Sequence, residues 1–184
     1  KKRKKLEEDY DDRSLCEKVK HKSSRPSALV WMAKSLTELG HYGDAKSILT
    51  YSKSLKKLSK KQREEIYLGD AWYNLKRSQY ATAIEDLEVA LKLEKGKARK
   101  AQINFLIGQL YEAINDPGTA VDRYQMALKK PKNFDLEFYA QMSIARLAVS
   151  SNTGDQEKIE KTLKKLIKGG KNKDFADQVH YAIA

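Results

Sequence analysis

Three histidines and one cysteine are the side chains of this 184-residue chain that most readily bind a metal or act as nucleophile and base. His21, His41 and His180 lie far apart in the sequence, and none is at metal-ligand spacing from another. None has that spacing to Cys16 either. We expect structural positions for all three: a helix-end cation for His21, a turn for His41, and a surface or packing site for His180.

The other polar clusters lack the geometry of an active site. The glycines of Gly169–Lys171 are not followed by the spaced glycine and the Ser or Thr of a phosphate-binding loop. The carboxylate pairs Asp11–Asp12 and Glu64–Glu65 are adjacent on predicted helices, where neighbours do not face each other. The sequence therefore predicts a protein that is not an enzyme and that holds no metal or cofactor.

Lysines supply much of the formal net charge of +12, and they recur at similar intervals along the chain. This spacing predicts a basic edge on a regular structure. One interpretation is that cations are favoured at helix C-termini, each by roughly 0.3–1 kcal/mol. The other is a surface for an acidic protein or an anionic membrane; few aromatic residues lie among these lysines, which argues against nucleic acid. The predicted basic edge comprises Lys56, Lys57, Lys60, Lys61, Lys95, Lys97, Lys129, Lys130, Lys164 and Lys165.

The elements that carry these lysines repeat. The stretch AWYNLKRSQYATAIEDLEVAL, from Ala71 to Leu91, has the spacing of a helix, a short polar turn and a second helix. One such hairpin cannot bury its own apolar face, so repetition is expected. A small residue recurs at steps of 38, 37, 37 and 39, at Ala33, Ala71, Gly108, Ala145 and Ala184. The small residue of the second helix recurs as Ala45, Ala83 and Ala120, with Tyr42 and Tyr80 three positions earlier.

This register resembles the tetratricopeptide repeat family over residues 26–184, although the period exceeds the usual length of about 34. The resemblance implies an all-α, right-handed α-solenoid of helix hairpins, with about four full repeats and partial repeats at both ends. The expected repeats are 26–59, 60–97, 98–134, 135–173 and a truncated fifth at 174–184. Residues 1–25 are expected to form a basic leader and the second helix of a preceding partial repeat.

Local signals place the helix ends. Pro26 suits a first helical turn, and Ser59 with Gln62 has the spacing of a capping box. Gly40 to Gly43 is expected to form the first turn, and Gly96 to end a helix in the left-handed conformation. In the third repeat Pro117 is expected to begin the second helix and Pro131 to end it.

The positions of each first helix that do not pack within the hairpin are expected to line a groove for an extended or helical peptide. The alternative is that some of them pack between adjacent repeats. The lysine and asparagine clamp with which co-chaperone members of the family bind a C-terminal carboxylate is absent from the corresponding positions. The predicted groove comprises Val30, Lys34, Leu68, Trp72, Leu75, Phe105, Gln109, Met142 and Arg146.

The closing stretch KNKDFADQVHYAIA narrows the resemblance. It is similar to segments of the large tetratricopeptide lipoproteins of the type IX secretion and gliding-motility machinery of Bacteroidetes, in which such a stretch opens a repeat. The resemblance implies a periplasmic location and an outer-membrane anchor through a lipidated N-terminal cysteine outside this sequence. Cys16 is not that cysteine, because no apolar signal segment precedes it.

Together these observations predict a non-enzymatic scaffold whose partners are other protein subunits, those of the secretion machinery if the narrower resemblance holds. No small-molecule substrate is expected. Two alternatives stay open: a chaperone-type receptor for peptides of exported clients, and a protein that binds an anionic surface or RNA through its basic edge. The second alternative predicts a steep loss of affinity with salt.

Overall fold

The computed structural model describes residues 24–129, 133–150, 160–161, 163–165, 168 and 176–183. Within these ranges the regular elements are helices, and no strand is present. The all-helical prediction is confirmed for this part of the chain. In order, the helices are α2 (Arg25–Glu38), α3 (Tyr42–Ser54), α4 (Lys60–Lys76), α5 (Tyr80–Leu93), α6 (Lys97–Ala113), α7 (Pro117–Leu128), α8 (Phe134–Ser150) and α10 (Ala176–Ile183).

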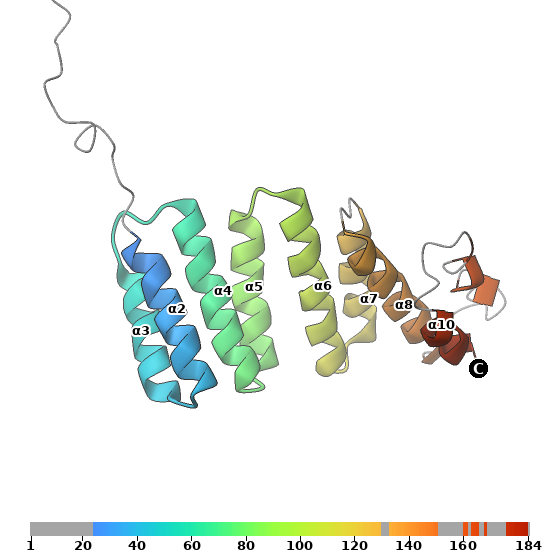
Figure 1. Ribbon diagram of the computed structural model, residues 1–184, viewed down its shortest axis with the longest axis horizontal. Helices are drawn as coiled ribbons and strands as arrows, with labels where there is room; N and C mark the ends of the chain where they lie inside the picture. Colours follow the sequence, from blue (N-terminus) through green and yellow to red (C-terminus); the bar gives the residue numbers. More distant parts are fainter. Residues whose placement is uncertain are drawn as a thin grey trace, which may run out of the picture.

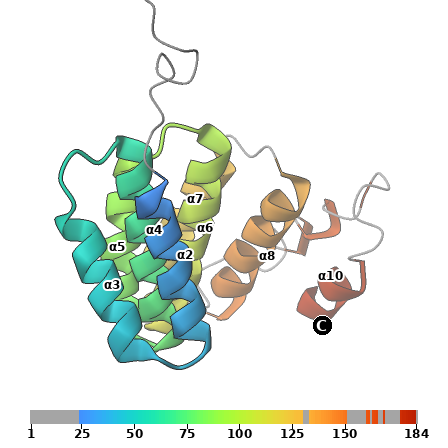
Figure 2. The ribbon, with the colours of Figure 1, turned by 60° about the vertical axis from the view of Figure 1, so that its left-hand side comes forward.

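The helices α2 to α8 succeed one another along the length of the molecule (Figure 1). Three hairpins are formed by α2 with α3, α4 with α5, and α6 with α7. Neighbouring hairpins meet through α2 and α3 against α4, α5 against α6, and α7 against α8. With the N-terminal side turned forward, α2 and α3 lie in front of α4 and α5 (Figure 2). This sequential order of contacts is that of a helical repeat array.

The turns inside the three hairpins have the same backbone structure. Each contains one residue with positive φ, and the residue after it donates its N–H to the carbonyl five positions earlier, at 2.9, 2.8 and 2.8 Å. This is the Schellman arrangement, which satisfies carbonyls at the end of the first helix. The steps of 38 and 37 residues between these turns match the steps between the small residues. The residues with positive φ are Gly40 (80°), Ser78 (55°) and Asn115 (60°).

Three predicted helix starts are confirmed. The Ser59 Oγ accepts the backbone N–H of Gln62 at 3.2 Å, and the Gln62 Oε1 accepts the N–H of Ser59 at 3.0 Å, which completes the capping box of α4. Pro26 and Pro117 lie in the first turns of α2 and α7, where proline lacks only an N–H that would have no helical partner.

Two glycine predictions are wrong. Gly43 lies inside α3, because the Schellman turn is complete at His41 and the helix begins at Tyr42. Gly96 has a φ of −77° and precedes α6 rather than ending α5. The carboxylate of Glu94 accepts the backbone N–H groups of Lys95 and Gly96, which holds this connection extended.

Each hairpin buries a small residue of its first helix together with a larger residue of its second helix. In the third hairpin the larger residue is a tyrosine, and a Cβ added to the glycine would lie 2.7 Å from its ring. Glycine is therefore required there, whereas alanine suffices beside leucine. The pairs are Ala33 with Leu49, Ala71 with Leu87, and Gly108 with Tyr124.

The first and second hairpins are joined by an ionic network whose carboxylates are buried. The carboxylate of Asp70 on α4 pairs with Lys53 of α3 and, at 3.1 Å, with Lys46. The Nζ of Lys53 also lies 3.2 Å from Asp86 of α5, which accepts the Asn74 amide at 2.8 Å. Burial and the charge of Asp70 raise the pKa of Asp86. Burial alone would lower the pKa of Lys53, but its bonds to Asp70 and Asp86 raise it.

The later hairpins have aliphatic residues at the positions of Lys53 and Asp70. Leu91 lies 38 residues after Lys53, and Ile107 lies 37 residues after Asp70. A further step of 37 residues leads from each to Leu128 and Ile144. Leu91 and Ile107 share one core cluster, and Leu128 and Ile144 share another. The same joint is therefore ionic at the first junction and apolar at the next two.

Some predictions lie outside the described residues. They are the leader at 1–23 with Cys16 and His21, the positions of Lys130 and Pro131, residues 151–155 of the predicted turn SSNTGD, and the stretch Gly169–Lys173. The first residue of that turn, Ser150, is instead the last residue of α8.

Candidate partner-binding surfaces

The predicted groove on the first helices is partly closed. Val30 was expected to line it, but this residue is only 5% exposed. It lies against Gly69, where an added Cβ would be 2.9 Å from the Val30 Cγ1. The missing side chain lets α2 approach α4 closely, and Val30 fills the contact. The assignment of Val30 to an open groove is therefore corrected: it packs between repeats.

Three further groove positions are half-buried. Leu68 and Leu75 pack against the core cluster formed by α4, α5 and α6. The ring of Phe105 lies 5.3 Å from that of Tyr124, centroid to centroid. These side chains follow the alternative interpretation, in which groove positions pack in the core or between repeats. On the described face these three positions therefore do not form an open apolar groove.

The remaining groove positions are accessible and mostly polar. Trp72, Gln109 and Arg146 are exposed, whereas Lys34 and Met142 are half-buried. The Nζ of Lys34 lies 5.1 Å from the centre of the Trp31 ring, and Trp31 itself is 68% exposed. We call Lys34, Trp72, Gln109, Met142 and Arg146 the first-helix row.

Two acidic residues tie the first-helix row to neighbouring helices. Glu38 of α2 accepts the indole N–H of Trp72 at 3.0 Å and the Nζ of Lys76 at 2.9 Å, both from α4. The same Lys76 lies 4.8 Å from the centre of the Trp72 ring. Glu112 of α6 pairs with Arg146 of α8. Glu38 is not among the residues predicted for this surface, and its spacing of 38 residues to Lys76, close to one repeat, is the signal that would have found it.

The predicted lysines of the connections are exposed. Lys56 and Lys57 lie between α3 and α4, Lys60 and Lys61 begin α4, and Lys95 and Lys97 flank the start of α6. Both connections lie at the upper end of the helices in Figure 1. Lys129, after α7, and the pair Lys164 and Lys165 are exposed as well, and Lys164 pairs with Glu160.

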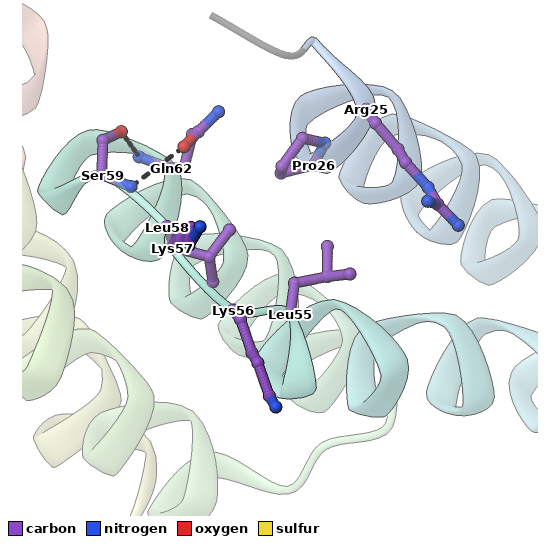
Figure 3. A pocket seen from close by; sticks show the side chains of 8 residues that line it. All are labelled: Arg25, Pro26, Leu55, Lys56, Lys57, Leu58, Ser59 and Gln62. Carbon is purple, nitrogen blue, oxygen red and sulfur yellow. Dashed lines mark hydrogen bonds between the residues drawn. The ribbon is translucent and has the colours of Figure 1, made fainter.

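Two hollows open at this edge, one beside each connection. The first hollow has a volume of about 440 Å³, and no carboxylate is among the described residues that line it (Figure 3). Pro26, Leu55 and Leu58 give it an apolar floor. Its lining consists of Arg25, Pro26, Leu55, Lys56, Lys57, Leu58, Ser59 and Gln62.

The second hollow is larger, about 630 Å³, and has two glutamates among its lysines and arginine. The Nε of Arg99 lies 3.3 Å from Glu64 and 3.4 Å from Glu94. Burial, a hydrogen bond with Glu94 and repulsion from that carboxylate raise the pKa of Glu64. The backbone N–H of Gly96 and the bond to Glu64 lower the pKa of Glu94. The two glutamates of the second hollow therefore offset part of the positive charge of its lysines and arginine.

The described residues contain no group of three or more His, Cys, Asp or Glu that could hold a metal ion. His41 and His180 are both exposed, His41 just before α3 and His180 in α10. Among the described helices, none has the length and hydropathy needed to cross a bilayer.

Comparison of the chain with protein-family models, with curated proteins and with solved structures found no match. Its function is therefore inferred from the surfaces described above.

Proposed function

We propose that this chain is a non-catalytic scaffold of the tetratricopeptide type, a right-handed solenoid that binds another protein through the first-helix row. The observation that carries this proposal is the row itself. Exposed Trp72, Gln109 and Arg146 occur at equivalent positions of successive first helices, where one partner segment can contact all of them. A large aromatic and an arginine are the side chains that most often dominate the binding energy of protein interfaces.

The links to Glu38 and Glu112 support the same proposal. They hold the ends of Trp72 and Arg146 in place before a partner arrives. Side chains that are already ordered lose less conformational entropy on binding, so a fixed row favours affinity. The polar character of the row favours a partner segment with hydrogen-bonding groups over a purely apolar helix.

We further propose that the partner belongs to the type IX secretion or gliding-motility assembly and that the chain works in the periplasm at the outer membrane. The support for this narrower proposal is the similarity of the closing stretch, residues 171–184, to the tetratricopeptide lipoproteins of that machinery.

An affinity capture from a cell-envelope extract of the source organism tests both levels. The Trp72→Ala/Arg146→Ala variant is compared with wild type and with Met126→Ala, which removes a comparably exposed apolar side chain from a second helix. We expect one or two envelope subunits to be captured by wild type and by Met126→Ala and lost, at least tenfold, with the double variant.

Circular dichroism establishes that each variant is folded. Equal capture by the double variant would refute the first-helix row. Capture of many unrelated peptides would replace the scaffold with a peptide receptor. Specific partners that are not envelope proteins would refute only the secretion assignment.

A further inference from the structure

The first hollow combines an apolar floor with a cationic rim. Pro26 is buried and Leu55 and Leu58 are half-buried, so the floor is solid but reachable. Figure 3 shows the Leu55 side chain directed toward the space below Pro26, between the connection and the start of α2. A hollow of about 440 Å³ is large enough to accept an aliphatic or aromatic side chain of a partner.

The rim of the first hollow is positively charged. Lys56 and Lys57 are exposed, and no ion pair to either is present in the described part of the chain. Arg25 adds a third charge that is fixed in place, since it donates to the Tyr51 hydroxyl at 2.6 Å and stacks on that ring. A carboxylate-bearing ligand complements such a rim.

The capping box at the hollow argues against a bare phosphate. At an uncapped helix N-terminus, free N–H groups bind phosphate oxygens. Here the N–H of Gln62 already donates to Ser59, and the N–H of Ser59 donates to Gln62. The capping box thus occupies two N–H groups at this helix start, and the lysine side chains beside it suit carboxylates spaced along a flexible segment.

The lining also disfavours nucleic acid and membrane. The described residues that line the hollow include no aromatic ring, whereas single-stranded nucleic acid is usually bound by stacking its bases on aromatic side chains. Membrane-surface binding needs apolar side chains that protrude into the bilayer, and the apolar groups here form a recess.

The connection that builds the hollow has a defined shape. Lys57 adopts a φ of 62°, a left-handed conformation that is uncommon for residues other than glycine. The first half of the connection is thereby fixed at Lys57, and its second half is fixed by the Ser59 capping box.

From these contacts we propose that the first hollow binds an acidic segment of a partner protein, with one apolar side chain seated on Pro26, Leu55 and Leu58 and flanking carboxylates on Lys56 and Lys57. This deepens the proposed scaffold function, on which it rests, by adding a second contact away from the first-helix row.

The test is fluorescence anisotropy of the full 184-residue chain with a labelled peptide that has one leucine between two groups of three glutamates. Replacement of the leucine by glycine in the peptide should weaken binding about tenfold while leaving the protein unaltered. The Lys56→Glu/Lys57→Glu variant should weaken binding of the leucine peptide more than tenfold. The matched control, Lys95→Glu/Lys97→Glu at the second hollow, makes the same charge change and should alter affinity less than twofold.

Three outcomes would overturn the proposal: equal affinity for the leucine and glycine peptides, an equal loss with both lysine variants, or no peptide binding. In the last case anionic lipid vesicles and single-stranded RNA are titrated, and binding of either that is lost in Lys56→Glu/Lys57→Glu would assign the hollow to that ligand. The titration does not involve Trp72 or Arg146, so its failure is distinct from failure of the first-helix row.

Discussion

The first and second junctions of the array place their acidic residues in opposite ways. At the first junction, the carboxylates of Asp70 and Asp86 are buried between helices, and no carboxylate is among the described residues that line the hollow at the edge. At the second junction, Leu91 and Ile107 occupy the buried joint, and the carboxylates of Glu64 and Glu94 lie at the edge.

The difference shows that the spacing of lysines does not by itself define a binding surface. Lysines recur at both connections, yet the electrostatic character of each hollow depends on acids that come from other elements. Glu64 lies in the N-terminal part of α4, and Glu94 directly follows α5. The two residues are close only because α4 and α5 pack together as a hairpin. An anionic partner therefore has one favourable hollow rather than two equivalent ones.

The largest effect is expected from breaking the ionic joint. Lys53→Leu leaves Asp70 and Asp86 buried and repelling each other, which should lower the free energy of unfolding by about 2–3 kcal/mol; we take a value below the usual range for buried pairs because Lys53 is partly exposed. Adding Asp70→Ile recreates the aliphatic joint of Leu91 and Ile107 and should recover at least half of the loss. Urea unfolding of the single and double variants measures both. A double variant no more stable than Lys53→Leu would contradict the equivalence of the joints.

A somewhat smaller effect is expected inside the hairpins, at the position held by Ala33, Ala71 and Gly108. Gly108→Ala places a Cβ against the Tyr124 ring and should destabilise by about 2 kcal/mol, the usual cost of overpacking. Gly108→Ala combined with Tyr124→Leu restores the alanine and leucine of the first two hairpins and should be more stable than Gly108→Ala alone. Thermal unfolding compares them, and additive losses would show that the pairs are not equivalent.

The two junctions should also differ in their response to pH. Because the pKa of Glu64 is raised, the folded state binds more protons there than the unfolded state, so its contribution to stability falls as pH rises above the ordinary value of 4.5. The lowered pKa of Glu94 acts below that value, where stability is lost as pH falls. Glu64→Gln should flatten the decline between pH 4.5 and neutrality. Unfolding curves across this range test it, with Glu85→Gln, an exposed glutamate of α5, as the matched control.

The smallest effect is expected at the first connection, which contains a left-handed residue that the second connection lacks. Lys57→Gly removes the steric cost of a φ of 62° and should stabilise the fold by about 0.5 kcal/mol, after the entropy cost of glycine. Lys56→Gly, one residue earlier without positive φ, should instead destabilise by about 0.5–1 kcal/mol. Urea unfolding measures both variants. If Lys57→Gly and Lys56→Gly shifted the midpoint of unfolding equally, the left-handed conformation of Lys57 would carry no strain.

Local signals in the sequence were sufficient for the hairpins. The small residues, the Ser59 capping box and the first-turn prolines act within one or two turns of helix, and each is found where it was predicted. The turn at Ser78 has the same structure as that at Gly40, although serine gives no direct signal of positive φ.

Contacts between repeats were harder to predict because they depend on pairs far apart in sequence. Val30 is buried only because Gly69, 39 residues later, lacks a side chain that would hold the helices apart. The Lys53–Asp70 pair contradicts the simple expectation that a joint between repeats is apolar. The charge of each hollow depends on which of its lysines and arginines pair with an acidic residue from another helix. The spacing of lysines in the sequence does not show this pairing.

The links between successive first helices have a mechanical consequence. Ser27 with Glu65 and Glu38 with Trp72 tie α2 to α4 at both ends, but α4 and α6 are tied only near their N-termini, by Glu64 and Arg99, among the described contacts. A pulling force along the array should therefore open it first between the far ends of α4 and α6, with the glutamate pair as the pivot. Because Glu64 and Glu94 titrate in acid, we expect the force needed to separate these ends to depend on pH.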